Sequence, residues 1–161
     1  MEELIKKVEE WSAERGLDTA DPNKQRLKLW EEFGELCAAV ARSNREGAID
    51  AIGDMLVVMI IYKQQLGYGS NDVFYPGQDQ DILDFLGRLD YTALIDDIGR
   101  EIYDSRSYIN GLGMVVENLT VLAYRLGTNL EECLAAAYDE IKDRRGKMVN
   151  GVFVKESDLN G

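Results

Sequence analysis

One stretch of the sequence is apolar on all sides of a helix. Every residue from Met55 to Ile61 is apolar, and the helical pattern around this run covers about residues 46–66, up to Gly67. A helix without a polar face is buried on most of its sides. The segment is therefore expected to be an interior helix, which other parts of the chain must cover.

Helical patterns also extend over most of the remaining chain. Asp21 followed by Pro22 is typical of a helix N-cap and the first helical position. The predicted helices cover about residues 1–15, 22–43, 46–66, 79–86, 90–107, 111–126 and 129–145, and residues 67–78 are predicted to form a loop. The sequence thus predicts an all-α fold, an antiparallel helix bundle that forms a single domain over residues 1–161.

The C-terminal tail has a different pattern. Asn150-Gly151 separates two short β-prone runs within residues 147–155. An Asn-Gly pair between such runs favours a tight turn between two antiparallel strands. A short C-terminal β-hairpin is therefore predicted after the last helix.

The composition limits the classes of function. The chain has 161 residues, of which 45% are hydrophobic, and this is enough for one compact core. Its 18 basic and 30 acidic residues give a formal charge of −12. This charge argues against nucleic acid as a partner, because backbone phosphates need positive charge on the protein. Histidine is absent, which excludes imidazole chemistry.

The sequence predicts neither a membrane span nor an export signal. The apolar run from Met55 to Tyr62 is much shorter than the ~20 residues that a transmembrane helix needs, and Met1 leads directly into an acidic amphipathic segment. Cys37 and Cys133 have apolar neighbours in helical patterns, as expected for buried thiols in a reducing compartment. We therefore expect a cytoplasmic protein without a membrane partner.

Acidic residues form two groups on the helices at either side of a short connection, residues 43–47. They are Glu31, Glu32 and Glu35 on the first helix, and Asp50 and Asp54 on the second. The glutamates fall within about 100° of one another on the helical wheel, away from the apolar face. Because the connection is short, the two helices are expected to be antiparallel neighbours, and Glu32 and Glu35 can face Asp54.

The two aspartates at the start of the buried helix need a partner. Carboxylates in such a position cost free energy unless they are paired or bind a cation, and no lysine or arginine lies between Arg45 and Lys63. A divalent cation accounts for the arrangement. Mg²⁺ prefers oxygen ligands, with Mn²⁺ as an alternative ion, and Asp54 is the expected inner ligand. Two alternatives stay open: the helix dipole favours Asp50 at a helix start, and the glutamates can be a solvated helix face.

Basic residues lie at the end of the last predicted helix. They are Lys142, Arg144 and Arg145. The helix dipole alone makes cations favourable there. The functional alternative is that Lys142 or Arg145 binds phosphate oxygens beside the metal.

The acidic residues resemble the motif of the MazG-like family, the all-α nucleoside triphosphate pyrophosphohydrolases. Glu31-Glu32-Phe33-Gly34-Glu35 matches E-E-x-x-E, the first half of that motif, and Asp54 matches the last residue of the second half, E-x-x-D. The glutamate of the second half would fall at Ala51, and Asp50 is the nearest substitute. The resemblance covers residues 26–67 and also 128–159, which are similar to the C-terminal part of MazG-like proteins of phages and bacteria.

The resemblance implies a reaction and a role for each acidic residue. The family hydrolyses nucleoside triphosphates between the α and β phosphates with Mg²⁺, giving a monophosphate and pyrophosphate. By resemblance, Glu32, Glu35 and Asp54 hold metal, while Glu31 or Asp50 orients the attacking water or binds a second ion. No motif indicates the base. The aromatic residues that could stack on a base, or belong to the core, are Trp11, Trp30 and Tyr62.

Residues 68–127 separate the two regions that resemble the family. Asp97-Ile98-Gly99-Arg100-Glu101 is similar to residues 32–36, which indicates a degenerate second copy of the helix pair. In this alignment Arg100 lies opposite Glu35 and Met114 opposite Asp54, so the second copy lacks a metal site. The family usually pairs its helix bundles by dimerisation. The chain is therefore expected to form either a homodimer or an intrachain pseudo-dimer through the inserted segment.

Three functions are compatible with these features. The leading expectation is an Mg²⁺-dependent nucleotide pyrophosphohydrolase that sanitises a nucleotide pool. The second is a nucleotide-sensing binding protein without turnover, which the replacement of the expected glutamate by Asp50 favours. The third is an acidic interaction protein, for example a DNA mimic, which only the net charge suggests.

Overall fold

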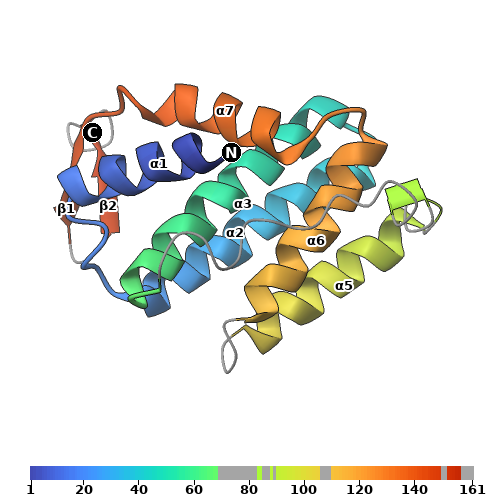
Figure 1. Cartoon of the computed structure of the whole chain (residues 1–161), viewed down its shortest axis with the longest axis horizontal. Coiled ribbons are helices and arrows are strands. Elements are labelled where there is room, and N and C mark those ends of the chain that lie inside the picture. The colour runs from blue at the N-terminus through green and yellow to red at the C-terminus, as the bar shows by residue number, and fades with distance from the viewer. Residues whose placement is uncertain (69–82, 85–87, 89, 106–109, 150–151, 157–161) are drawn as a thin grey trace.

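The computed structural model describes residues 1–68, 83–84, 88, 90–105, 110–149 and 152–156 (Figure 1). The helices are α1 (Glu2–Glu14), α2 (Pro22–Ala41), α3 (Arg45–Gln65), α5 (Tyr91–Asp104), α6 (Asn110–Arg125) and α7 (Leu130–Ile141), and the strands are β1 (Gly146–Val149) and β2 (Val152–Lys155). The two strands pair in an antiparallel hairpin in which Gly146 lies opposite Lys155. The described residues are mostly helical with one small two-stranded sheet, as the sequence predicts.

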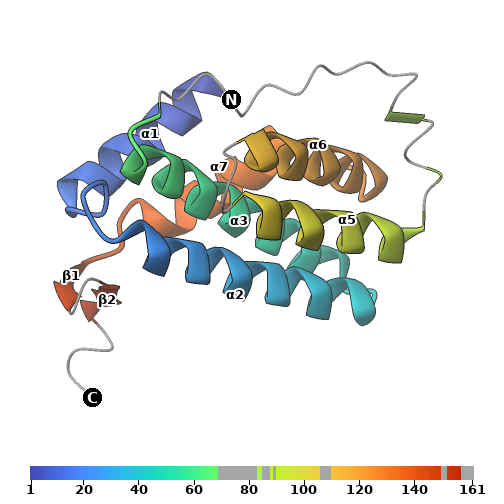
Figure 2. The same ribbon diagram turned by 90° about the horizontal axis from the view of Figure 1, so that it is seen from below.

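Helix α3 is the interior helix of the fold. It packs against α1, α2, α6 and α7, and every side chain from Met55 to Ile61 is buried. In Figure 2 it runs alongside α2 through the middle of the molecule. The apolar run therefore predicted the position of this helix correctly. No helix in the described ranges is both long and apolar enough to cross a membrane.

The start of α2 and the start of α3 are capped by side chains. The Asp21 carboxylate accepts a hydrogen bond from the Asn23 backbone N–H at 2.9 Å, and Pro22 occupies the first turn. The Asn44 side chain accepts one from the Gly47 backbone N–H at 3.1 Å. These caps satisfy N–H groups that have no partner within the helix. The Asn44 cap lies in the short connection between α2 and α3 and fixes the start of α3 there.

Helices α5 and α6 pack against each other and form a second pair beside the first (Figure 2). Helix α5 lies against α2, and α6 lies against α3. At the first contact Gly99 is so close to Phe33 that an added Cβ would lie 3.2 Å from the ring. The repeat, the intrachain pseudo-dimer and the homodimer stay predictions. The predicted loop 67–78 and helix 79–86 lie largely outside the described residues.

The last helix is shorter than the sequence pattern predicted. Helix α7 ends at Ile141, whereas the pattern extended it to residue 145. The physical reason is that α1 provides hydrogen-bond donors for carbonyl groups of the segment that follows. The Trp11 indole N–H donates to the Ile141 carbonyl at 2.9 Å, and Arg15 donates twice to the Arg144 carbonyl. The chain leaves the helix here and runs directly into the hairpin.

Candidate active-site cavity

A cavity of about 610 Å³ lies among α2, α3, the end of α7 and strand β2. Its lining combines acidic, basic and apolar side chains. The acidic residues in the lining are Asp21, Glu31, Glu32, Glu35, Asp54 and Glu140, and the basic residues are Lys24, Lys28, Arg144 and Lys155. A cavity of this size and mixed lining suits a small, charged organic ligand.

The structure brings four of the predicted acidic residues to this cavity. Glu31, Glu32 and Glu35 reach it from α2, and Asp54 reaches it from α3. Glu32 is the most enclosed of the glutamates, with a relative exposure of 5%. The antiparallel arrangement of the two helices thus places the two halves of the acidic pattern at one site, as the sequence indicated.

Three other predicted site residues do not line the cavity. Asp50 is exposed in the first turns of α3, and Lys142 and Arg145 are exposed beyond the end of α7. Lys142 instead forms an ion pair with Asp139 at 2.7 Å. Arg144 takes the position that the sequence assigned to its neighbours, because α7 ends before this segment and the helical spacing no longer applies.

The carboxyl group of Asp54 is in an unfavourable place for a negative charge. Burial raises its pKa from 3.8 to about 7, and the nearby carboxylates of Glu32, Asp50 and Glu140 act in the same direction. Arg144 opposes this increase, but in the described part of the chain no basic side chain lies within ion-pair distance of Asp54. A cation beside Asp54 would therefore be strongly favourable.

Glu32 has a basic partner that Asp54 lacks. Burial raises the pKa of Glu32, and Lys28 opposes that increase through a direct hydrogen bond. The Lys28 ammonium lies 2.6 Å from a carboxylate oxygen of Glu32 and 3.0 Å from one of Glu31. One lysine therefore ties together two of the carboxylates that line the cavity.

The donor set of the cavity fits a hard divalent cation. Mg²⁺ and Mn²⁺ take carboxylate oxygens as ligands, and Glu32, Glu35 and Asp54 present such oxygens at one cavity. Across the described ranges, no three acidic or thiol side chains already lie close enough together to enclose an ion. Binding a cation here thus requires that the carboxylates turn toward one another about their side-chain torsions.

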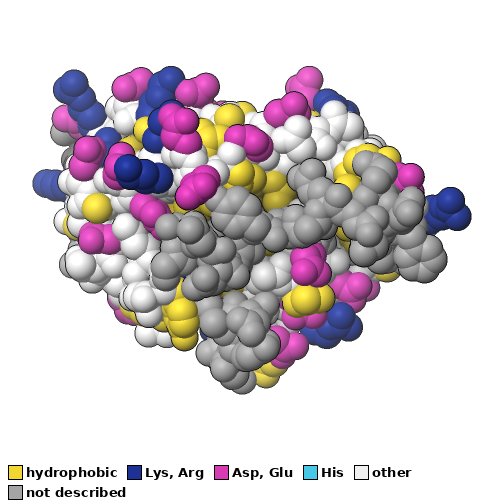
Figure 3. All heavy atoms as spheres, viewed as in Figure 1, with side chains coloured by type: hydrophobic (Ala, Val, Ile, Leu, Met, Phe, Trp, Pro, Cys, Tyr) yellow, Lys and Arg dark blue, Asp and Glu magenta, His cyan; other side chains and the backbone are white. Residues whose placement is uncertain are grey.

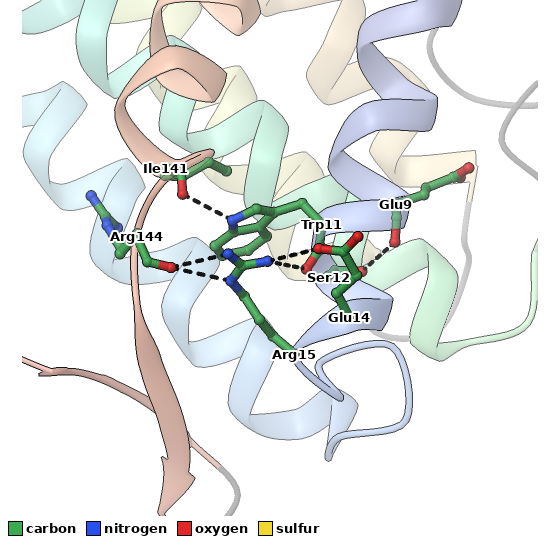
Figure 4. Close-up of polar contacts among 7 residues, drawn as sticks. All are labelled: Glu9, Trp11, Ser12, Glu14, Arg15, Ile141 and Arg144. Carbon is green, nitrogen blue, oxygen red and sulfur yellow. Dashed lines mark hydrogen bonds and ion pairs between the residues drawn. The ribbon is translucent and has the colours of Figure 1, made fainter.

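Trp11 of α1 and Arg15, the residue at its C-terminal end, hold the segment that carries Arg144 (Figure 4). Nε and Nη2 of Arg15 donate to the Arg144 carbonyl at 3.2 and 3.1 Å, and its guanidinium group lies 4.6 Å from the centre of the Trp11 ring. Trp11 in turn donates to the Ile141 carbonyl and packs edge-on against Phe153 of the hairpin. These contacts fix the backbone on which Arg144 and the cavity wall depend.

The three candidate stacking residues lie in different environments. Trp11 lines the cavity, although its indole N–H is already bonded to Ile141. Trp30 packs edge-on against Phe33, with 5.9 Å between the centres of the two rings, and Tyr62 belongs to the buried core. Among the described cavity-lining residues, Trp11 and Phe153 are the aromatic ones.

Six charged residues of the cavity were not predicted as site residues: Asp21, Lys24, Lys28, Glu140, Arg144 and Lys155. Lys28 could have been found, because it lies three and four residues before Glu31 and Glu32 and such pairs meet on a helix surface. No local spacing pattern in the sequence indicated that Glu140 and Arg144 would reach the cavity. They reach the cavity only because α7 packs on α3 and because α1 holds the segment after α7.

The face formed by α1 and α7 does not concentrate acidic residues. In Figure 3 acidic and basic side chains are interspersed over these two helices. Ion pairs one turn apart, such as that between Lys7 and Glu3, account for part of this mixing. A DNA mimic would instead present a surface of one sign.

Arg15→Met tests the support of the cavity wall. The variant loses both hydrogen bonds to Arg144 and the cation–π contact with Trp11, so the free energy of unfolding should fall by roughly 1–2 kcal/mol. Arg42→Met is the matched control, because Arg42 is exposed and donates only within its own helix. Urea unfolding followed by circular dichroism measures the free energy of unfolding of both variants. Equal losses in the two variants would contradict the assigned role of Arg15.

Comparison with known proteins gives a relative but no family. The chain is 46% identical over 66 residues to the "uncharacterized 18.2 kDa protein in rep-hol intergenic region" of Haemophilus phage HP1. The match covers 40% of this chain and 40% of that protein, so the chain spans well under half of its relative. No protein-family model matches the chain, and no solved structure is significantly similar to it.

Proposed function

We propose that this protein is an Mg²⁺-dependent hydrolase that cleaves nucleoside triphosphates to monophosphates and pyrophosphate. The observation that carries the proposal is the meeting of Glu31, Glu32 and Glu35 with Asp54 at one cavity. These are the residues through which the sequence resembles the MazG-like pyrophosphohydrolases. The cavity volume, about 610 Å³, falls in the range of about 300–1,000 Å³ that small-molecule sites occupy.

The acidic residues have distinct roles in this proposal. Glu32, Glu35 and Asp54 would hold the metal, which when bound neutralises charge on phosphate oxygens. Glu31 is more exposed than Glu32 and is the candidate for orienting the attacking water. The high pKa of Asp54, about 7, means that this residue must lose its proton before it can serve as a ligand.

Basic residues of the lining supply the contacts for the phosphates. Lys28, Arg144 and Lys155 come from α2, the segment after α7 and β2, so they face the cavity from different elements. Arginine and lysine bind phosphate oxygens by charge-assisted hydrogen bonds. Arg144 takes the phosphate-binding role that the sequence analysis gave to Lys142 or Arg145.

The apolar part of the lining leaves room for a base. Val57, Val58 and Ile61 follow Asp54 along α3 and line the same cavity. Seven residues of helix separate Asp54 from Ile61, which is about 10 Å at 1.5 Å per residue. This distance suits a nucleotide that extends along α3, with its phosphates beside Asp54 and its base beside Ile61 and Phe153.

Product analysis tests the reaction. Purified protein with Mg²⁺ and a panel of nucleoside and deoxynucleoside triphosphates should release pyrophosphate and a monophosphate, separated by ion-exchange chromatography. Glu35→Gln should lower kcat by about 10²-fold or more, because it removes a charged ligand of the metal. Glu46→Gln, at an exposed position of α3 outside the cavity, is the control. Release of orthophosphate and a diphosphate instead would refute the proposed bond cleavage.

A nucleotide-sensing protein is the second candidate, and one observation favours it. At the position of the family's second-half glutamate stands Ala51, which is buried, and the neighbouring Asp50 is exposed away from the cavity. The site thus contains one carboxylate fewer than the resemblance implies. Binding of a triphosphate with Mg²⁺ by the wild type, with no pyrophosphate released, would select this function over the hydrolase.

A further inference from the structure

Lys28 occupies the position where a cation is expected. Its ammonium group lies 2.6 Å from a carboxylate oxygen of Glu32 and 3.0 Å from one of Glu31. The Glu32 side chain is almost completely enclosed, with 6% relative exposure, whereas that of Lys28 is 44% exposed. The pair therefore joins an enclosed carboxylate to a cation that is partly open to solvent.

We propose that Lys28 is an exchangeable counter-ion of the site. It neutralises Glu31 and Glu32 while no divalent cation is bound, and an arriving Mg²⁺ displaces its ammonium group. The released ammonium group then binds the phosphate chain of the nucleotide. This inference rests on the proposed function, because it requires that the carboxylates bind a metal.

The exchange follows from the charges and the burial. A divalent cation and an ammonium group beside the same carboxylate repel each other. Binding of Mg²⁺ to Glu32 therefore weakens the ion pair with Lys28, and the ion pair weakens the binding of Mg²⁺. Glu32 has less room to move away than Lys28, because it is only 5% exposed. Lysine has a flexible four-carbon stem and a compact charge, so the ammonium group is the part that moves.

The displaced ammonium group stays at the cavity. Lys28 and the two glutamates all belong to its lining, and Lys24 lines it one helical turn earlier. The released ammonium group can therefore remain at the cavity, where it can donate a hydrogen bond to a phosphate oxygen. The same lysine thus pairs with the glutamates in the metal-free state and with the phosphates in the substrate-bound state.

A permanent structural ion pair is the competing role for Lys28. Lysine and glutamate at spacings of three and four residues often pair on helix surfaces without any functional role. The two roles predict opposite effects of removing Lys28. A structural pair organises the carboxylates, so its loss weakens metal binding. An exchangeable counter-ion competes with the metal, so its loss strengthens metal binding.

Calorimetric titration with Mg²⁺ in the absence of nucleotide distinguishes the two roles. Lys28→Met should lower the Kd for Mg²⁺ by roughly threefold to tenfold, since the competing charge is gone. The same variant should raise the Kd for an α,β-methylene triphosphate with Mg²⁺ by about tenfold, because a charged phosphate contact is lost. Lys24→Met changes the net charge equally and should alter Mg²⁺ binding much less. Circular dichroism checks that each variant is folded.

The outcomes separate this inference from the proposed function. If Mg²⁺ binds wild type and Lys28→Met equally, or binds the variant more weakly, the exchange is wrong and the metal site stands. If Mg²⁺ binds neither protein, the metal-dependent function itself is wrong and the inference falls with it.

Chemical labelling of the wild type gives a second measurement that needs no variant. Acetylation of Lys28 by acetic anhydride, followed by mass spectrometry, should become faster when Mg²⁺ is added and slower when the triphosphate analogue follows. Lys24 serves as the internal reference in the same sample. A Lys28 rate that Mg²⁺ leaves unchanged relative to Lys24 would overturn the exchange.

Discussion

Asp54→Asn is expected to reduce turnover strongly and to stabilise the fold at the same time. Pyrophosphate release should fall by about 10²–10³-fold, because the variant loses the charged group that faces the glutamates of α2. At pH 8 the variant should nevertheless resist unfolding better than the wild type, by about 2 kcal/mol. The reason is that burial and three neighbouring carboxylates disfavour the charge of Asp54, and asparagine carries none.

The effect on stability should depend on pH in a defined direction. The pKa of Asp54 is about 7 in the folded protein, above its ordinary value of 3.8, so the folded state holds the proton more tightly than the unfolded state. The stability of the wild type therefore falls as the pH rises from about 4 to 7. The stability of Asp54→Asn should not show this decrease. The difference in the free energy of unfolding between the variant and the wild type should therefore grow between pH 5 and pH 8.

Urea unfolding of the two proteins at pH 5 and pH 8, with and without Mg²⁺, measures these effects. Saturating Mg²⁺ should narrow the difference in stability between the two proteins at pH 8, because it should bind more tightly to the protein that retains all three carboxylates. Asp97→Asn is the matched control, since Asp97 lies on α5 and pairs with Arg100 at the surface. An Asp54→Asn variant that is less stable than the wild type at pH 8 would contradict the account of this carboxyl group.

Gly53→Ala is expected to destabilise the fold through the contact between α3 and α7. A Cβ at position 53 would lie 2.4 Å from the carbonyl oxygen of Cys133 and 2.9 Å from Cβ of Ala137. The backbone of α7 cannot rotate away as a side chain can, so the two helices would have to separate. We expect a loss of about 2–3 kcal/mol in the free energy of unfolding, even though alanine favours a helix more than glycine does.

Gly34→Ala provides the control for this prediction. Gly34 is exposed on α2, and a Cβ there would meet no atom within 4 Å. The substitution should therefore stabilise the protein by about 0.5–1 kcal/mol through helix propensity alone. Urea unfolding of both variants gives the comparison. Equal stability of Gly53→Ala and wild type would show that α3 and α7 can separate at little cost.

Much of the architecture follows from local patterns. The apolar run from Met55 to Ile61 indicated an interior helix, because no orientation of such a helix leaves a polar side for water. Asp21-Pro22 and Asn150-Gly151 marked a helix start and a hairpin, since both depend on backbone preferences of adjacent residues. The predicted end of α7 was wrong by four residues, because hydrogen bonds from α1 terminate the helix at Ile141.

The acidic half of the site was predictable for a similar reason. Glu32 and Glu35 share a helix face by spacing alone, and the short connection between α2 and α3 brings Asp54 to that face. Asp50 shows the limit of such reasoning. It has nearly the same direction on the helix as Asp54, but it lies one turn nearer the helix start and is exposed.

Local patterns were thus sufficient to predict the interior position of α3, its pairing with α2 and the acidic residues that these two helices bring together. These features depend on residues close in the chain, where helical spacing and a short turn set the geometry. Long-range packing, in contrast, brings Arg144 and Glu140 to the cavity and leaves Asp50, Lys142 and Arg145 outside it. The contacts that hold the segment after α7 join residues far apart in the chain, 130 positions in the case of Trp11 and Ile141. No local pattern encodes hydrogen bonds over such a separation.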